Sequence, residues 1–329
     1  MQASKIISSI SWALVASCVA SASAHAATKF PEKNIELIVG YKPGGGYGDL
    51  AQAIAPFIEK HLPNKVNVVV RNMDGASNVI AANYIQKAKP DGYTIGLYNV
   101  AGLALGQVGR KTQYDLAQVT WLGRLGVDNV LAMVSAKGPY NNILDFKKQT
   151  KPQYIVSIRG ITDNNTVAAA LAFDKLGVKW KPLNHEGASS AILSVIRGDA
   201  DIIMASYESF QQYLDSGDMK AILFYDDVRS PKLPNTPIPA EVGLKELGQA
   251  LNSQRMIGAP PGLPADVRAV LETAIKKAVD DPGFIELMRK SKKSIDYLDG
   301  KESAAVVNQT MSSHKNFSGI INGLVNEGK

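Results

Sequence analysis

The order of apolar segments limits the possible folds of this chain more than any other feature of its sequence. Short apolar runs such as IELIV (35–39) and VNVVV (66–70) alternate with longer amphipathic runs such as LAQAIAPFIEKHL (50–62) and NVIAANYIQKA (78–88). The alternation continues later in the chain, for example from YIVSI (154–158) onward. Strand-length runs that alternate with helix-length runs are typical of parallel sheets flanked by helices. The sequence therefore predicts an α/β fold.

Three segments carry finer structural predictions. Pro56 lies inside the first predicted helix, where a proline removes a backbone hydrogen bond, so we expect a kink or an early end there. The segment SPKLPNTPIPAEVGL (230–244) is rich in proline and is predicted to be an extended surface connection. A single final helix is predicted over residues 302–325.

Residues 1–26 have the composition of a secretory signal peptide. A basic start, MQASK, precedes the apolar stretch IISSISWALVASCVA, and small residues follow, with Ala24 and Ala26 at the expected cleavage positions. The apolar stretch is short and interrupted by serines, which argues against a membrane-spanning helix. We expect cleavage after Ala26 and release into the periplasm. The alternative is cleavage at the lipoprotein-like box VASC (15–18), which would leave Cys18 lipidated and the protein tethered.

Cysteine content and charge exclude several classes of function. Cys18 is the only cysteine, so disulfides, thiolate catalysis and cysteine-based metal sites are all excluded once the signal peptide is removed. The formal net charge of +6 falls by counting to about +5 without Lys5. The densest basic run, RKSKK (289–293), is interpreted as a solvated helix end. We therefore expect no nucleic-acid partner, and only a weak general preference for anions.

Polar loops follow many of the predicted strands. Each of these loops is rich in Gly, Ser, Asn or Asp: KPGGGYGD (42–49), RNMDGASN (71–78), NVAG (99–102), RGITDNNT (159–166), NHEGASS (184–190) and SYES (206–209). Ligands of parallel α/β sheets bind beyond the carboxyl ends of the strands. Helices that start there direct unpaired N–H groups and partial positive charge toward the same place. The loops therefore predict a small-molecule site that favours an anion.

The glycine run in the first of these loops has two possible explanations. Gly44, Gly45 and Gly46 would let main-chain amides approach a carboxylate, with Asp49 capping the following helix. Alternatively, the glycines serve a tight strand-to-helix turn without any ligand.

Sequence motifs for catalysis are weak. GGGYGD has Asp49 in place of the third glycine of a dinucleotide-binding loop, and no phosphate-binding P-loop motif occurs. His61 and His314 are predicted on helix surfaces, which leaves His185 beside Glu186 as the histidine in a polar loop. Adjacent residues of an extended segment point to opposite faces, so a shared role is disfavoured. We expect no catalytic residue, no cofactor and no metal site.

Two charged residues of the fourth loop remain candidates for ligand contact. Arg159 ends a predicted strand and could form a forked pair with a ligand carboxylate, or it could be an ordinary surface arginine. Asp163 could cap the next helix or bind a cation, and capping is favoured.

Long segments spread over the chain after residue 27 carry a family pattern. They include FPEKNIELIVGYKPGGGYGDLAQAIA, VVVRNMDGASNVIAANYIQKAKPDGYTIGLY, GVKWKPLNHEGASSAILSVIRGDADIIMAS and APPGLPADVRAVLETAIKKAVDDPGF. In these segments the sequence resembles the substrate-binding proteins of tripartite tricarboxylate transporters, also called the Bug family. The resemblance implies an extracytoplasmic solute receptor with a two-domain α/β fold similar to type II periplasmic binding proteins, and a ligand cleft between the domains.

The resemblance also implies a division of the chain. Residues 27–127 and 253–329 would form a first, discontinuous domain, and residues 128–252 would form the second. Crossing strands near 128 and 252 would act as hinges for closure around the ligand.

Members of this family hold small carboxylates largely through main-chain amides of two opposed loops. Carried onto this chain, the resemblance implies these ligand-binding residues: Pro43, Gly44, Gly45, Gly46, Tyr47, Asp49, Gly75, Ser77, Asn78, Tyr98, Asn99, Arg159, Gly160, Thr162, Asp163, Thr166, Gly187 and Ser206. The sequence departs from the family pattern at Tyr47, over 159–166 and at Met204-Ala205-Ser206, which leaves the identity of the carboxylate open.

We therefore expect a monomeric periplasmic solute-binding protein that delivers an organic carboxylate to the membrane permease of a tripartite tricarboxylate-type transporter. A receptor that reports to a membrane sensor is one alternative. An exported hydrolase is another, and it would depend on Ser77, Ser189, Ser206 or His185. A purely structural exported protein is disfavoured by the polar loops.

Overall fold

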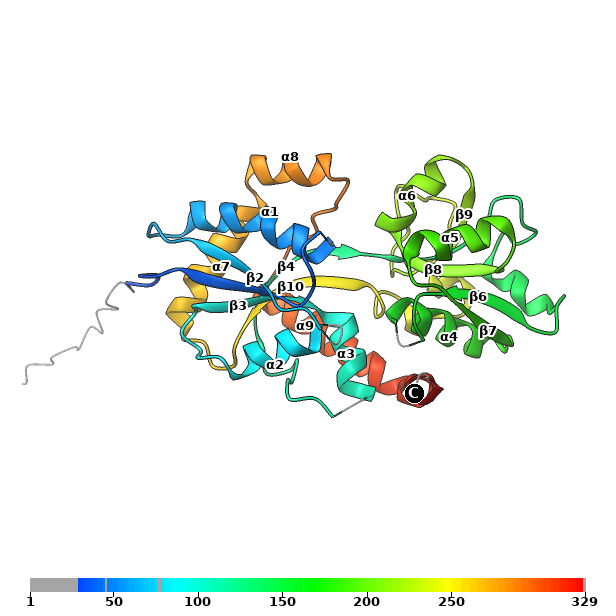
Figure 1. The fold of residues 1–329 in the computed structure, drawn as a ribbon, viewed down its shortest axis with the longest axis horizontal. Coiled ribbons are helices and arrows are strands. Elements are labelled where there is room, and N and C mark those ends of the chain that lie inside the picture. Colours follow the sequence, from blue (N-terminus) through cyan, green and yellow to red (C-terminus); the bar gives the residue numbers. More distant parts are fainter. Residues whose placement is uncertain (1–28, 45, 76–77, 110, 162, 328–329) are drawn as a thin grey trace, which may run out of the picture.

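The computed structural model describes residues 29–44, 46–75, 78–109, 111–161 and 163–327, and their backbone forms two sheets with helices on both (Figure 1). The first sheet has the strand order β11 (Leu298–Asp299), β4 (Thr120–Asp128), β10 (Ser253–Ala259), β3 (Thr94–Asn99), β1 (Ile35–Val39) and β2 (Val68–Asn72). The second has the order β7 (Trp180–Asn184), β6 (Tyr154–Ile158), β8 (Ile202–Ser206), β5 (Val130–Ser135) and β9 (Met219–Phe224). We call the two sheets with their helices the first lobe and the second lobe.

Helices cover both lobes. Those of the first lobe are α1 (Gly46–His61), α2 (Val79–Lys87), α3 (Val100–Gly109), α7 (Ala265–Val279), α8 (Pro282–Lys290) and α9 (Gly300–Asn316). Those of the second lobe are α4 (Asn164–Leu176), α5 (Ala188–Arg197) and α6 (Tyr207–Asp215), and α10 (Ser318–Glu327) ends the described chain. Short 3₁₀ turns occupy Ile143–Lys148, Pro239–Val242 and Lys245–Leu247.

The predicted α/β alternation is observed, and each sheet contains antiparallel strands in addition to the parallel ones that the alternation indicates. Strand β1 is parallel to β2 and β3, and β6 is parallel to β7 and β8. Strand β10 is antiparallel to β3 and β4, and β5 is antiparallel to β8 and β9. The reason is that these strands connect the lobes. Strand β4 leaves the first sheet and β10 returns to it, so the two must run in opposite directions.

The chain passes between the lobes at two places in the sequence. Asn129 alone separates β4 from β5, and residues 225–252 lead from β9 back to β10. The boundaries that the sequence predicts, 127/128 and 252/253, lie next to these two crossings. That these boundaries separate two independent domains stays a prediction.

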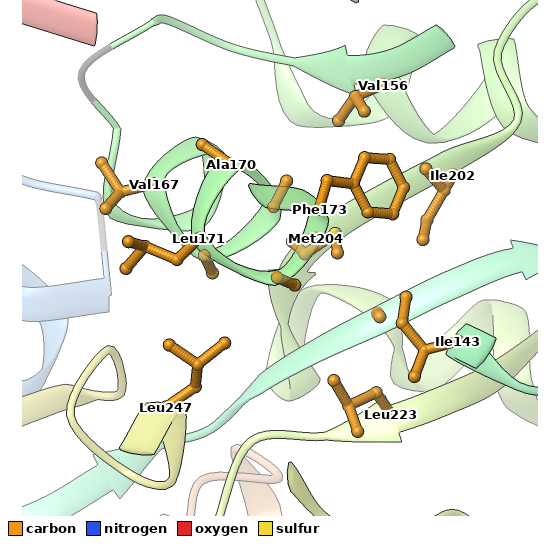
Figure 2. Packing of buried hydrophobic residues seen from close by; sticks show 14 of the residues in the cluster. Ile143, Val156, Val167, Ala170, Leu171, Phe173, Ile202, Met204, Leu223 and Leu247 are labelled. Atoms are coloured by element: carbon orange, nitrogen blue, oxygen red, sulfur yellow. The ribbon is translucent and has the colours of Figure 1, made fainter. Parts of the chain in front are cut away.

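Each lobe has its own apolar core. In the second lobe, α4 is buried along most of its length, and Figure 2 shows Phe173 of this helix pointing toward Ile202 of β8. In the first lobe, Ile54 of α1 and Ile275 of α7 pack with Leu37 of β1. Burial of such side chains is the main stabilising term for a chain of this size.

Helix α1 continues through Pro56, so the expected early end is wrong. The helix runs without interruption from Gly46 to His61. Pro56 is exposed, whereas Leu50, Ile54 and Ile58 on either side of it are buried against the sheet. This packing of the inner face offsets the loss of one backbone hydrogen bond at the outer face.

Helix α3 was not predicted, because its first residues were interpreted as the polar loop NVAG. Its sequence contains three glycines, each of which lowers helix propensity by about 1 kcal/mol relative to alanine. In the structure Val100, Leu103 and Leu105 of this helix are buried, and it packs against α9 and β10. Tertiary packing of an apolar segment therefore overrides its weak local preference.

The end of the chain forms two helices instead of the single one predicted over 302–325. Phe317 lies between them with backbone angles of φ −96° and ψ 8°, outside the regular helix, and α10 therefore takes a new direction. Phe317, Ile321 and Leu324 join the core of the second lobe, together with Leu105 of α3. The red C-terminal helix in Figure 1 thus links the two lobes.

The prediction that His314 lies on a helix surface is wrong. Its side chain is fully buried, and its Nδ1 lies 2.8 Å from the carbonyl oxygen of Thr310. Burial lowers the pKa of the imidazole from its ordinary value of 6.5 to about 4. The sequence around His314 could not reveal this burial, because the elements that cover the side chain are distant in the sequence.

We expect His314 to make the fold sensitive to acid. Its folded pKa is below its unfolded pKa, so the stability contributed by its neutral form is complete above pH 6.5 and is lost progressively as the pH falls from 6.5 to about 4. Between pH 7 and 4.5 the loss should be about 2–3 kcal/mol. Urea unfolding of His314→Gln at both pH values checks this. An equal loss in the variant and the unsubstituted protein would contradict it.

Candidate functional site

A cavity of about 990 Å³ lies between the two lobes. Its walls come from α1, β3, α3, β4 and β10 of the first lobe, and from the loop after β6, α4, the end of β8 and α6 of the second. Residues 291–293, which follow α8, complete its outer edge. The cavity is therefore positioned so that both lobes can contact one small molecule.

The structure brings together part of the predicted set. The cavity is lined by Gly46, Tyr47, Asn99, Arg159, Gly160, Asp163 and Ser206. Other predicted residues are not among its lining: Pro43, Gly44, Asp49, Gly75, Asn78, Tyr98, Thr166 and Gly187. Gly45, Ser77 and Thr162 lie outside the described residues. A role in ligand binding stays a prediction for the whole set.

Several predicted residues that do not line the cavity instead pack in the core or begin a helix. Tyr98 is 1% exposed, and its ring packs on Trp121 at 5.1 Å between centroids. Asn78 is buried and starts α2 with a φ of 78°, while Gly187 precedes α5 as its N-cap. The amide of His185 donates to Ile158 at the end of β6, and this histidine is not part of the cavity wall.

Of the two explanations for the glycine run, the tight turn applies to Gly44, and proximity to the ligand cavity applies to Gly46. Gly44 has a φ of +79°, a backbone conformation that favours glycine, and it therefore serves the turn. Gly46 begins α1 and lines the cavity. A Cβ added at Gly46 would lie 3.9 Å from Nη2 of Arg255.

Asp49 does not cap α1, so that prediction is wrong. The helix starts three residues earlier, at Gly46, and Asp49 is an exposed residue of its first turn. A carboxylate at this place still interacts favourably with the positive end of the helix.

The opposite wall is formed by the loop between β6 and α4. Asp163 caps α4 as predicted, since its side chain accepts a hydrogen bond of 2.9 Å from the amide of Asn165. Nη2 of Arg159 donates to the same carboxylate at 3.1 Å. The hydroxyl of Thr166, which does not line the cavity, donates to the carbonyl oxygen of Gly160 at 2.7 Å and stabilises the loop. Arg159 is thus partly neutralised by its own loop.

Two stacked tyrosines form the wall of the first lobe. The rings of Tyr41 and Tyr47 lie 4.7 Å apart and nearly parallel. Nδ2 of Asn99 donates to the hydroxyl of Tyr41 at 2.8 Å, and burial raises the pKa of that hydroxyl to about 12. Burial also raises the pKa of the Tyr47 hydroxyl, so both rings are neutral, and the stacking and the hydrogen bond hold them beside the cavity.

A buried ion cluster occupies the part of the cavity next to the crossing strands. We call Asp128, Glu208 and Arg255 the floor cluster. Arg255 Nη1 and Nη2 donate to the two oxygens of Glu208 at 2.7 and 2.9 Å, and Nη2 lies 3.2 Å from Oδ2 of Asp128. Arg255 belongs to the first lobe and Glu208 to the second, so the cluster joins the lobes directly.

Sequence reasoning missed the floor cluster. An arginine inside the apolar strand SQRMIGA was the available signal, because an unpaired arginine is rarely buried in a sheet. Burial raises the pKa of the Asp128 carboxyl to about 6, although Arg255 opposes this shift.

The basic run RKSKK also has a position that the sequence did not reveal. Helix α8 ends at Lys290 as a solvated helix end, in agreement with the prediction. Ser291, Lys292 and Lys293 then turn toward the cavity and form its lip. Lys292 has a φ of +53°, which marks the turn.

The described residues contain neither a metal-binding cluster nor a membrane-spanning helix. Within residues 29–327, apart from the gaps given above, no cluster of three or more His, Cys, Asp or Glu side chains is suited to a metal ion. In the same part of the chain, no helix has the length and apolar character needed to cross a membrane.

Comparison with known proteins shows the family. The model of the tripartite tricarboxylate transporter family receptor, TctC, matches residues 51–322. A UPF0065 protein of Bordetella pertussis is 25% identical over 283 residues, which cover 85% of this chain and 86% of the relative. This family consists of substrate-binding receptors and is not an enzyme family.

Solved structures show the fold. A TctC solute-binding protein from Polaromonas is similar with a TM-score of 0.77 and 26% identity, covering 91% of this chain and 99% of that one. Two Rhodopseudomonas palustris structures share the fold at lower identity. MatC with bound malate has a TM-score of 0.67, 21% identity and coverage of 88% and 100%. A second protein, with adipate, has a TM-score of 0.68, 20% identity and coverage of 89% and 98%.

The predicted two-domain fold of periplasmic binding proteins, with its cleft, is thereby confirmed. The family match covers most of the chain, and the matched structures agree with it in fold. The chain therefore belongs to the family of tripartite tricarboxylate transporter receptors.

Proposed function

We propose that this protein captures a small organic carboxylate in the cavity between its lobes and delivers it to the membrane permease of a tripartite tricarboxylate-type transporter. One observation carries the proposal. Helices α1 and α4, from opposite lobes, both begin at the cavity, through Gly46 on one side and Asn164 and Asn165 on the other. The first amides of a helix lack partners within the helix and favour an anion. At α4 the carboxylate of Asp163 already accepts from the amide of Asn165.

We propose that main-chain amides bind the carboxylate on both walls of the cavity. Gly46 and Gly160 leave room for a ligand atom to approach the main chain. Apart from chain neighbours and the backbone of the same helix, Nη2 of Arg255 is the one heavy atom of the described residues within 4 Å of either Cβ position. Arg159 adds a cation beside Gly160, although Asp163 shares it. The ligands named for two proteins of the same fold, malate and adipate, are both carboxylates and support this class.

Closure of the lobes is the proposed step that retains the ligand. A ligand that contacts both lobes stabilises the closed arrangement by the difference between its affinities for the closed and open states. The connections that would bend are Asn129 and residues 225–252. Export depends on residues 1–26, which lie outside the described structure, and periplasmic location of this chain is part of the proposal.

A thermal-shift screen tests the proposed function. Monomeric chain from Ala27 onward is heated with mono-, di- and tricarboxylates, amino acids and aromatic acids, and each hit is confirmed by calorimetry. A ligand present at about 100 times its Kd should add about 2.7 kcal/mol to the free energy of unfolding. Amines and neutral sugars of similar size serve as controls. The proposal is rejected when no compound with a carboxylate binds.

A further inference from the structure

The charged side chains around the cavity differ in burial. Three groups of them line it in the described part of the chain: the floor cluster, the Arg159–Asp163 pair and the two lysines of the lip. The floor cluster has two carboxylates for one guanidinium, the pair on the wall is balanced, and the lip has Lys292 and Lys293. By formal charge the buried floor cluster is therefore negative, and the less buried lysines of the lip are positive.

The carboxylates of the floor face the cavity more than the guanidinium does. The side chain of Glu208 is 19% exposed and that of Asp128 is 9% exposed, whereas that of Arg255 is 4% exposed. Tyr47 covers Arg255, with its ring 5.7 Å from the guanidinium carbon. A ligand that reaches the floor therefore meets carboxylate oxygens first.

The negative charge of the floor is incompletely neutralised. Arg255 is shared by both carboxylates, and the distance to Asp128, 3.2 Å, is longer than the distances of 2.7 and 2.9 Å to Glu208. The raised pKa of Asp128, about 6, agrees with this arrangement, since burial and the neighbouring Glu208 both disfavour its ionised form. An additional cation at this place would share the partly exposed carboxylates of Asp128 and Glu208 through charge-assisted hydrogen bonds.

We propose that the ligand carries a cationic nitrogen in addition to its carboxylate, and that this nitrogen lies over Asp128 and Glu208. The inference rests on the proposed function and narrows it to amino carboxylates. The carboxylate end would lie at the amides of Gly46 and Gly160, and the Cβ position of Gly46 is 3.9 Å from Nη2 of Arg255. A second carboxylate on the ligand would instead lie against the floor and be repelled.

The test compares matched ligands of about three to six carbons by titration calorimetry. For each length, the ω-amino acid and the α-amino acid are compared with the diacid and with the unsubstituted monoacid. We expect the best amino acid to bind at least about tenfold more tightly than any diacid, as for one added charged hydrogen bond. Diacids that bind more tightly than every amino acid would overturn the inference.

Variants of the floor test the position of the nitrogen. Glu208→Gln should reduce the preference for the amino acid over the diacid by about tenfold, because one carboxylate of the floor is lost. Asp128→Asn is the second variant and should act in the same direction. Glu241→Gln is the matched control, since Glu241 accepts from Arg229 at 2.8 Å on the same lobe but is not part of the cavity wall.

The outcomes separate the two proposals. Carboxylates that bind with an unchanged preference in both floor variants would overturn the present inference and leave carboxylate capture standing. Absence of binding by every carboxylate, with or without an amino group, would overturn carboxylate capture itself and this inference with it. A preference that shifts equally in Glu241→Gln would show a general charge effect and would also overturn the inference.

Discussion

Replacement of Arg255 by methionine is expected to lower the free energy of unfolding by about 3–5 kcal/mol at pH 7.5. The substitution keeps an unbranched side chain but leaves Asp128 and Glu208 facing each other without their shared cation. Breaking a buried ion pair from one side is costly because the remaining charge stays desolvated. Guanidinium unfolding of the chain from Ala27 onward, followed by circular dichroism, measures the loss.

Acid should partly rescue the Arg255→Met variant. The folded pKa of Asp128 is about 6, above its ordinary value of 3.8, so the folded state holds this proton more tightly than the unfolded state. Its contribution to stability is therefore greatest below pH 3.8 and declines as the pH rises through 6. Without Arg255 the pKa rises further, and the deficit of the variant should be smaller at pH 5 than at pH 7.5.

The matched control for this variant is Arg289→Met. Arg289 pairs with Glu286 on α8, but its side chain is 71% exposed, and surface pairs of this kind contribute about 0–1 kcal/mol. A loss below about 1 kcal/mol in Arg255→Met, similar to that of the control, would show that the floor cluster does not stabilise the fold as argued.

Replacement of Gly46 by leucine is expected to weaken carboxylate binding by more than about 100-fold, or about 2.8 kcal/mol, with little change in stability. Gly46 is the first residue of α1, and its open side faces the cavity, so a leucine side chain would occupy the space proposed for the ligand. Leucine also has a higher helix propensity than glycine, so the fold should tolerate it. Calorimetric titration with the best carboxylate of the screen gives the affinity, and thermal unfolding gives the stability.

Gly319→Leu is the matched control for Gly46→Leu. Gly319 is also a helical glycine, and outside its own helix no heavy atom of the described residues lies within 4 Å of its Cβ position. It belongs to α10 and does not line the cavity. It should leave affinity unchanged. Wild-type affinity in a folded Gly46→Leu variant would reject the proposal that the start of α1 contacts the ligand.

Local patterns in the sequence were sufficient to predict most helices and strands and one loop that lines the cavity. Apolar spacing predicted most strands and helices, and the loop that contains Gly160 and Asp163 was identified because a helix cap and a strand end leave short-range signals. The family could also be predicted, because its motifs follow in order along most of the chain. These features depend on residues that are close together in the sequence.

The tertiary structure decided the features that depend on distant partners. Packing between elements determines three such features. These are the antiparallel strands β5 and β10, the glycine-containing helix α3 and the burial of His314. The floor cluster is the clearest case, because Arg255 and Glu208 are 47 residues apart and belong to different lobes. Periodicity and capping act over a few residues, whereas ion pairing across a cleft depends on the order of strands and the placement of the lobes. The sequence by itself thus determined the elements and the family, and only the tertiary structure decided which charges meet beside the ligand.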